Sequence, residues 1–199
     1  MERRSKFDFE GWHYRGYLPH FEAGSTAQFI TFRLADSLPI SLFRRLKIRL
    51  ETGQISKSEY GYFLDRYLDR SKGDCFLNDR RISILVRDSI LFGEGSRYKL
   101  HSWVIMPNHV HLLITPDEDQ TLERIMHSIK SFTAHGANKI LKRKGSFWSK
   151  EYFDRFIRDG KHFAKTMRYI AMNPVKAGLC DAPEKWEFSG AFKGKDSEA

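Results

Sequence analysis

Two histidines separated by one valine carry the strongest chemical signal in this chain. His109 and His111 follow a Pro-Asn turn, and apolar residues lie on both sides of the pair. This pattern predicts a buried strand. Because side chains alternate along a strand, both imidazoles should share one face, and Val110, Leu112 and Ile114 should share the other. Two imidazoles on one face suit a divalent metal or a proton-transfer site, although a half-exposed strand with two polar positions fits the same pattern.

A tyrosine near the carboxyl end of the chain is the second chemical candidate. Apolar residues recur at helical spacing over residues 160–173, which predicts a helix that Pro174 ends. Tyr169 and Asn173 are four residues apart, so they share one face of that helix. Tyr169 could be a nucleophile and Asn173 could offer an oxygen to a metal. A packing tyrosine and an ordinary helix-end asparagine are the alternatives.

The elements that must position these residues belong to one α+β domain. Its expected limits are residues 25–189, after a lead-in over 1–24 and before a polar tail over 190–199. The order of elements predicts helices packed against an antiparallel sheet. Apolar spacing and glycine breaks predict strands over 26–34, 98–106, 109–115 and 152–158, and further helices over 39–50, 56–70, 77–92 and 121–143.

Composition narrows the class of partner. The 199 residues contain 34 Lys and Arg against 25 Asp and Glu, a net charge of +9 that favours a polyanion. No long apolar span predicts a membrane helix, and no apolar stretch behind the N-terminus predicts a secretory signal. Cys75 and Cys180 form no metal-binding spacing, so we expect reduced thiols and a cytoplasmic location.

In the order and spacing of its motifs, the chain resembles the single-tyrosine HUH transposases (His, bulky hydrophobic residue, His). The closest resemblance is to the REP-associated tyrosine transposases. The blocks that carry it are residues 16–21 with 29–34, residues 106–113, residues 145–158 and residues 169–179.

That resemblance implies a ferredoxin-like antiparallel sheet with the HUH motif on a central strand and a helical insertion over about 35–97. It also implies that Tyr169 attacks single-stranded DNA near hairpins such as REP-like palindromes. The products would be a 5′-phosphotyrosine link, from which the strand can be rejoined, and a free 3′-OH. His109, His111 and Asn173 would hold Mg²⁺ or Mn²⁺. Family members act as monomers or homodimers.

Four further residues are candidates for contact with DNA. Lys130, Arg155 and Arg158 could bind phosphate, and Trp148 could stack on an unpaired base. Asp154 could instead pair with either arginine, and Trp148 could anchor the core.

Three other functions stay open at this stage. They are a non-catalytic nucleic-acid-binding domain of the same fold, a nickase of the relaxase or replication-initiator type, and a metal-dependent hydrolase that uses activated water without Tyr169.

Overall fold

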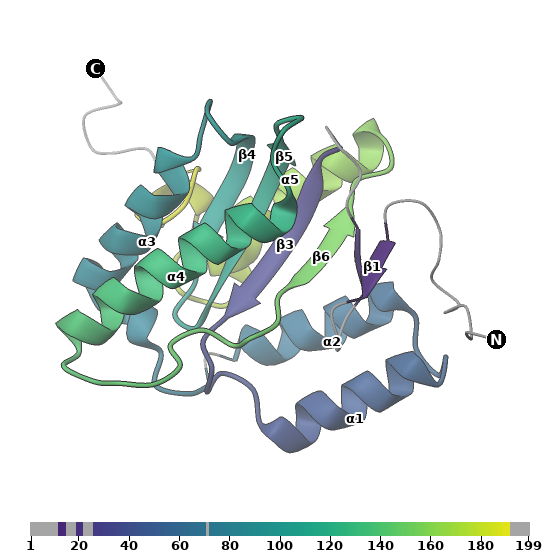
Figure 1. Cartoon of the computed structure of the whole chain (residues 1–199), viewed down its shortest axis with the longest axis horizontal. Coiled ribbons are helices and arrows are strands. Elements are labelled where there is room, and N and C mark those ends of the chain that lie inside the picture. Colours follow the sequence, from purple (N-terminus) through teal and green to yellow (C-terminus); the bar gives the residue numbers. More distant parts are fainter. Residues whose placement is uncertain (1–11, 15–18, 22–25, 71, 192–199) are drawn as a thin grey trace.

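A computed structural model describes residues 12–14, 19–21, 26–70 and 72–191 of the chain (Figure 1). Most of the predicted lead-in and residues 192–199 of the predicted tail lie outside these ranges. The strands are β1 (Trp12–Tyr14), β2 (Pro19–Phe21), β3 (Gln28–Arg33), β4 (Tyr98–Ile105), β5 (His109–Pro116) and β6 (Phe153–Phe156). The helices are α1 (Ile40–Glu51), α2 (Lys57–Leu68), α3 (Arg80–Phe92), α4 (Leu122–Ile140) and α5 (Gly160–Lys176), with short 3-10 turns η1 (Phe76–Asn78) and η2 (Pro183–Lys185).

The main sheet has four antiparallel strands in the order β4-β5-β3-β6. β3 leads through α1, α2 and α3 to β4, and β5 leads through α4 to β6. β3 and β5, the first and third strands of this sheet along the chain, therefore occupy its middle, as in a ferredoxin-like fold. The predicted α+β class, the helical insertion after the first strand and the central position of the HUH strand are confirmed.

Helices cover both faces of this sheet (Figure 1). One core joins α3 and α4 to the side chains of β3 and β5 that include Ile30, Phe32, Val110 and Leu112. The other core joins α1, α2 and α5 to the opposite side chains, including Phe29. The period of two along β3 and β5 thus assigns each residue to one of two buried layers.

Local sequence signals explain where several helices begin. Ser56 forms a capping box with Glu59 at the start of α2, and Thr121 accepts a hydrogen bond from Arg124 N at the start of α4. The helix predicted from residue 77 begins instead at Arg80, because Asp79 caps it by accepting from Arg81 N. The 3-10 turn η1 occupies the preceding residues.

The position of α2 depends on a glycine at the point where the helix meets the sheet. A Cβ atom added at Gly61 would lie 2.8 Å from Cζ of the buried Phe153 on β6. The missing side chain lets α2 approach the face of the sheet that also holds α5. The residues one turn beyond Gly61 are therefore brought close to α5.

The prediction that Pro174 ends the last helix is wrong. α5 continues to Lys176, and both Asn173 and Pro174 are buried within it. Proline fits the helical φ angle and removes one N–H donor, while Ala177 N still donates to the carbonyl of Asn173. Ala177 is the C-cap of the helix, and Gly178 follows it with a φ of +71°. Asn173 consequently lies inside a regular turn and not at a free end.

The segment after α5 covers the open edge of β4. Ile105 N donates to the carbonyl of Phe188 over 2.8 Å, and Gly190 N donates to the carbonyl of Trp103 over 2.9 Å. Gly190, predicted to begin the polar tail, is thus paired with the sheet. No helix in the described part of the chain is both long and apolar enough to cross a membrane.

Candidate active site

The two histidines of β5 lie side by side beneath α5. Both are fully buried, which excludes the alternative of a half-exposed strand. As predicted, they share one face of the sheet, while Val110 and Leu112 belong to the core on the other face. Their Nε2 atoms are 3.1 Å apart, so both imidazoles are directed at nearly the same point.

A hydrogen-bond chain determines which nitrogen of His109 is free. Asn108 donates from Nδ2 to the carbonyl of Lys72 over 2.9 Å, so its Oδ1 must face the other way. That oxygen lies 2.7 Å from Nδ1 of His109 and can only accept. Nδ1 therefore carries the proton, and the lone pair of Nε2 faces His111.

His111 is held in a similar way by the neighbouring strand. Thr31 of β3 is its register partner, and the Thr31 hydroxyl lies 2.8 Å from His111 Nδ1. A hydroxyl can accept from a protonated Nδ1, which leaves the Nε2 lone pair for a cation. The ring of Phe29 stacks on His111 with centroids 5.3 Å apart and fixes its plane.

Burial keeps both imidazoles neutral. It lowers the pKa of His109 to about 3. Burial, followed by the neighbouring His109, holds the pKa of His111 well below its ordinary value. Neutral imidazole is the form that binds metals.

Asn173 of α5 completes the set of potential ligands. Its Nδ2 lies 3.3 Å from His111 Nε2, and its buried Oδ1 has no hydrogen-bond partner among the described residues. A rotation of the Asn173 amide by 180° exchanges Nδ2 and Oδ1 and would bring Oδ1 to the histidine nitrogens. The described residues contain no cluster of three or more His, Cys, Asp or Glu that could hold a metal. Any third protein ligand of a metal beside the two histidines would therefore be of another type, such as the Asn173 amide.

The spacing of the two imidazoles fits a hard divalent cation. Ligands at neighbouring corners of an octahedron lie about 3.0 Å apart when each bond is about 2.1 Å. The observed Nε2 separation of 3.1 Å agrees with this value. Two imidazoles and one amide oxygen would leave several positions for water or phosphate, unlike a closed zinc site.

Tyr169 lies one turn before Asn173 and beside the same histidine. Its ring meets the edge of the His111 ring, with centroids 5.6 Å apart, and its hydroxyl donates to Asp65 Oδ2 over 2.9 Å. Burial raises the pKa of the Tyr169 phenol far above its ordinary value, and the negative charges of Asp65 and Asp69 raise it further. The phenol is therefore protonated at rest.

Sequence reasoning missed two carboxylates, that of Asp65 on α2 and that of Asp69 at its C-cap. Burial raises the pKa of Asp65 to about 7 and the pKa of Asp69 to about 6. Each has a buried Oδ1 without a hydrogen-bond partner in the described part of the chain. Their four-residue spacing on one helix was the only available signal, because nothing local to residues 57–68 shows that α2 packs beside α5.

A groove of about 520 Å³ opens beside Tyr169. Phe29, Asp65 and Tyr169 line it together with cationic side chains from β6, α5 and the loop between them. Arg155 lies over the Phe29 ring at 5.8 Å, and its buried Nε has no hydrogen-bond partner among the described residues. The cationic residues of the groove are Arg155, Arg158, Lys161 and Lys165.

The structure brings Arg155 and Arg158 to this groove but places the other two predicted DNA contacts elsewhere. Lys130 lies on α4, the helix that covers the opposite face of the sheet, and donates to the carbonyl of Lys150 over 2.8 Å. The predicted stacking of Trp148 on a base is wrong, because its indole is buried in the core. It packs against Phe32 and donates to the hydroxyl of Thr133.

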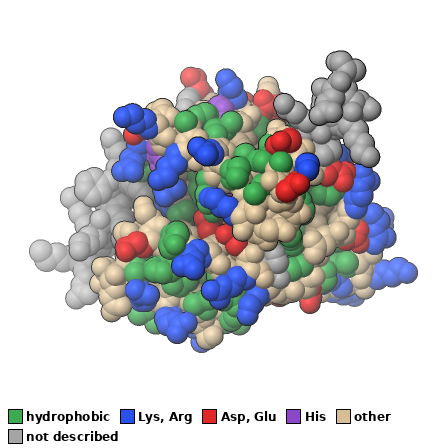
Figure 2. All heavy atoms as spheres, turned by 180° about the vertical axis from the view of Figure 1, so that it is seen from behind, with side chains coloured by type: hydrophobic (Ala, Val, Ile, Leu, Met, Phe, Trp, Pro, Cys, Tyr) green, Lys and Arg blue, Asp and Glu red, His purple; other side chains and the backbone are tan. Residues whose placement is uncertain are grey.

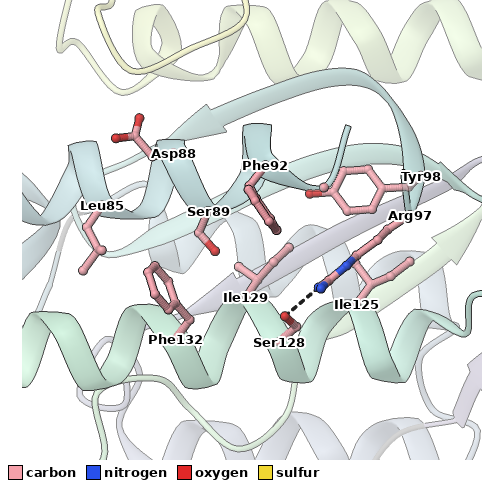
Figure 3. Close-up of a pocket in the computed structure, with 11 residues that line it drawn as sticks. Leu85, Asp88, Ser89, Phe92, Arg97, Tyr98, Ile125, Ser128, Ile129 and Phe132 are labelled. Atoms are coloured by element: carbon pink, nitrogen blue, oxygen red, sulfur yellow. Dashed lines mark hydrogen bonds between the residues drawn. The ribbon is translucent and has the colours of Figure 1, made fainter. Parts of the chain in front are cut away.

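Further hollows among the described residues lie away from the histidines. An apolar groove of about 420 Å³ runs between α3 and α4, where Leu85, Phe92, Ile129 and Phe132 converge (Figure 3). Its lining contains neither histidine nor tyrosine of the candidate site. Another, of about 380 Å³, lies between α1 and α2 and contains four arginines: Arg45, Arg49, Arg66 and Arg70. Lys and Arg side chains are numerous on the lower part of the molecule in Figure 2, where these helices lie.

Comparison with known proteins points to one group. Residues 92–173, which include both histidines, Tyr169 and Asn173, match the family described as "Transposase IS200 like". The chain is 29% identical over 121 residues to a REP-associated tyrosine transposase of Escherichia coli, a match that covers 57% of this chain and 70% of that protein. It is 28% identical over 104 residues to a Haemophilus influenzae protein assigned to the same group, covering 47% of this chain and 59% of that protein.

A solved structure has a similar fold. A REP-associated tyrosine transposase bound to a REP hairpin superposes with a TM-score of 0.53 and 20% sequence identity, over 89% of this chain and 80% of that one. These comparisons confirm the predicted resemblance to REP-associated tyrosine transposases.

Proposed function

We propose, from this similarity and from the geometry around Tyr169, that the protein cleaves and rejoins single-stranded DNA near hairpins. The observation that carries the proposal is the convergence of Tyr169, Asn173 and the two histidines on one buried point from two separate elements. A domain that only binds nucleic acid would need no such arrangement. A water-activating hydrolase would need the histidines without the tyrosine.

Tyr169 is the proposed nucleophile. Its hydroxyl attacks a DNA phosphate, which forms a 5′-phosphotyrosine link and releases a 3′-OH. The covalent link conserves the energy of the phosphodiester, so another 3′-OH can later displace the tyrosine and rejoin the strand. Edge-to-face contacts of the Tyr169 ring with Phe29 and His111 hold the phenol in one orientation.

His109, His111 and Asn173 are the proposed ligands of Mg²⁺ or Mn²⁺. When bound, the cation would polarise the phosphate and stabilise the charge that develops on it. Asn108 and Thr31 keep the Nδ1 protons in place and so direct the Nε2 lone pairs at the site.

Two cationic surfaces are proposed to bind the DNA. The groove beside Tyr169, with Arg155 and Arg158, would hold the strand that is cut. The arginine groove of α1 and α2 would bind backbone phosphates of the hairpin. Within the described residues, no salt bridge involves the four arginines of this second groove, Arg45, Arg49, Arg66 and Arg70. Their guanidinium groups can therefore bind phosphate.

Adduct formation on a labelled hairpin with a single-stranded flank tests the proposal. Wild-type protein with Mn²⁺ should form a covalent adduct on a denaturing gel, and mass spectrometry should place the phosphate on Tyr169. Tyr169→Phe should bind the hairpin and form no adduct, while the matched control Tyr152→Phe should react normally. Strand cleavage by Tyr169→Phe would favour the hydrolase, and binding by wild type without any cleavage would favour a binding module.

A further inference from the structure

The Tyr169 phenol needs a destination for its proton if it is to attack a phosphate. A neutral phenol is a weak nucleophile, and the hydroxyl of Tyr169 still holds its proton, which it donates in the hydrogen bond to Asp65. The nearest basic atoms of the HUH motif are the two Nε2 atoms, which the proposed cation would occupy. A separate proton acceptor is therefore required.

We propose that Asp65, on the helical insertion, is the general base that takes the proton from Tyr169 during cleavage and returns it during rejoining. This inference rests on the proposed function and adds a catalytic residue that the transposase motifs do not contain. Asp65 Oδ2 already accepts the hydrogen bond of the phenol over 2.9 Å, within the reach that a general base needs.

The surroundings of the phenol single out Asp65 among the charged groups near it. Lys176 of α5 lies over the Tyr169 ring, with Nζ 4.9 Å from the centroid, and is cationic. Arg155 of β6 is also cationic and acts on Asp65 and Tyr169 through its charge. Asp69, at the C-cap of α2, acts on the phenol through its charge alone, whereas the hydroxyl of Tyr169 donates to Asp65. Asp65 is thus the carboxylate in direct contact with the reacting oxygen.

The surroundings of Asp65 also give its carboxyl a pKa that suits a general base. Burial raises the pKa of Asp65 to about 7, with Tyr169 and Arg155 opposing the shift and Asp69 adding to it. A base with a pKa near the working pH combines a useful ionised fraction with strong affinity for the proton.

The bonds and protons of this step balance with water as the only additional reagent. The O–H bond of Tyr169 breaks and its proton passes to Asp65 Oδ2 as the phenolic oxygen forms a bond to phosphorus. The P–O3′ bond breaks, the 3′ oxygen leaves with the electron pair, and water protonates it. In rejoining, the incoming 3′-OH loses its proton to water, the phosphotyrosine bond breaks, and Asp65 returns its proton to the phenolic oxygen.

Asp65→Asn separates proton transfer from positioning. The amide keeps the size of the side chain and an oxygen that can accept from Tyr169, but it cannot take the proton. We expect single-turnover adduct formation at pH 7 to slow by about 10²- to 10⁴-fold, with hairpin affinity, measured by fluorescence anisotropy, unchanged. The wild-type rate should rise with pH and level off above about pH 7, and Asp65→Asn should lack this inflection. Asp65→Glu should recover part of the rate.

Asp69→Asn is the matched control, because it removes the half-buried carboxylate at the C-cap of the same helix without touching the phenol. Its rate should stay within about threefold of wild type, and its pH profile should keep the inflection. An Asp65→Asn rate near that of wild type, or an unchanged pH inflection in that variant, would overturn the role of Asp65 and leave the proposed function standing. Absence of any adduct in wild type would overturn the proposed function and this inference together.

Discussion

Thr31→Val tests whether the neighbouring strand prepares His111 for metal binding. Valine keeps the shape of threonine and removes the hydroxyl that lies 2.8 Å from His111 Nδ1. In the metal-bound form, His111 must carry its proton on Nδ1, and the variant offers that buried N–H no acceptor. An unpaired buried donor costs about 1–3 kcal/mol, and each 1.4 kcal/mol is a factor of about ten in affinity.

We therefore expect Thr31→Val to bind Mn²⁺ about 10- to 100-fold more weakly than wild type. Loss of the free Mn²⁺ signal in electron paramagnetic resonance measures this affinity without DNA or catalysis. Adduct formation should require correspondingly more Mn²⁺ and should recover at saturation. The metal-free variant should also melt about 2–4 °C lower for each kcal/mol of stability that it loses.

Thr133→Val is the matched control on the other face of the sheet. Thr133 is fully buried, and its hydroxyl accepts from Trp148 Nε1 over 2.9 Å. This variant should lose stability of a similar order but bind Mn²⁺ as wild type does. Equal Mn²⁺ affinity in Thr31→Val and wild type, with both proteins folded by circular dichroism, would refute the argument that Thr31 orients His111.

Three further predictions concern α1 and α2. The folded-state pKa of Asp65 is raised from 3.8 to about 7, so its burial favours the protonated form and weakens the fold progressively as pH rises from 3.8 to about 7. In urea unfolding, the stability of Asp65→Asn should therefore exceed that of wild type by more at pH 8 than at pH 5, and an equal difference at both pH values would contradict this. Gly61→Val should clash with Phe153, destabilise the protein by about 1–3 kcal/mol and slow adduct formation by displacing Asp65. A melting temperature and an adduct rate that both equal those of wild type would contradict this. Arg66→Glu combined with Arg70→Glu should weaken hairpin binding and flatten its salt dependence, and an unchanged salt slope in anisotropy titrations would remove this groove from the DNA surface.

Local patterns in the sequence were enough to predict much of the fold. The alternation around His109 and His111 predicted a buried strand and the face that each side chain occupies, and β5 has both features. Helical spacing likewise placed Tyr169 and Asn173 on one face, and both side chains meet His111. These outcomes follow from the fixed periods of strands and helices, which neighbours in sequence determine.

Local patterns were less reliable where packing competes with backbone preference. Pro174 was expected to end its helix. The free energy lost with one N–H donor is smaller than the free energy gained by burying this turn, so α5 continues to Lys176. Trp148 was compatible with base stacking or core anchoring in the sequence. Its contacts with Phe32 and Thr133 assign it to the core.

The sequence by itself determined the residue types that could do chemistry: two imidazoles two residues apart, and a phenol and an amide one helical turn apart. Only the tertiary structure decided that these two pairs meet, because β5 and α5 are about 60 residues apart and converge through packing. It also decided that Thr31 and Asp65 belong with them. Neither carries a local signal, since the roles of both depend on strand register and on how closely α2 approaches the sheet.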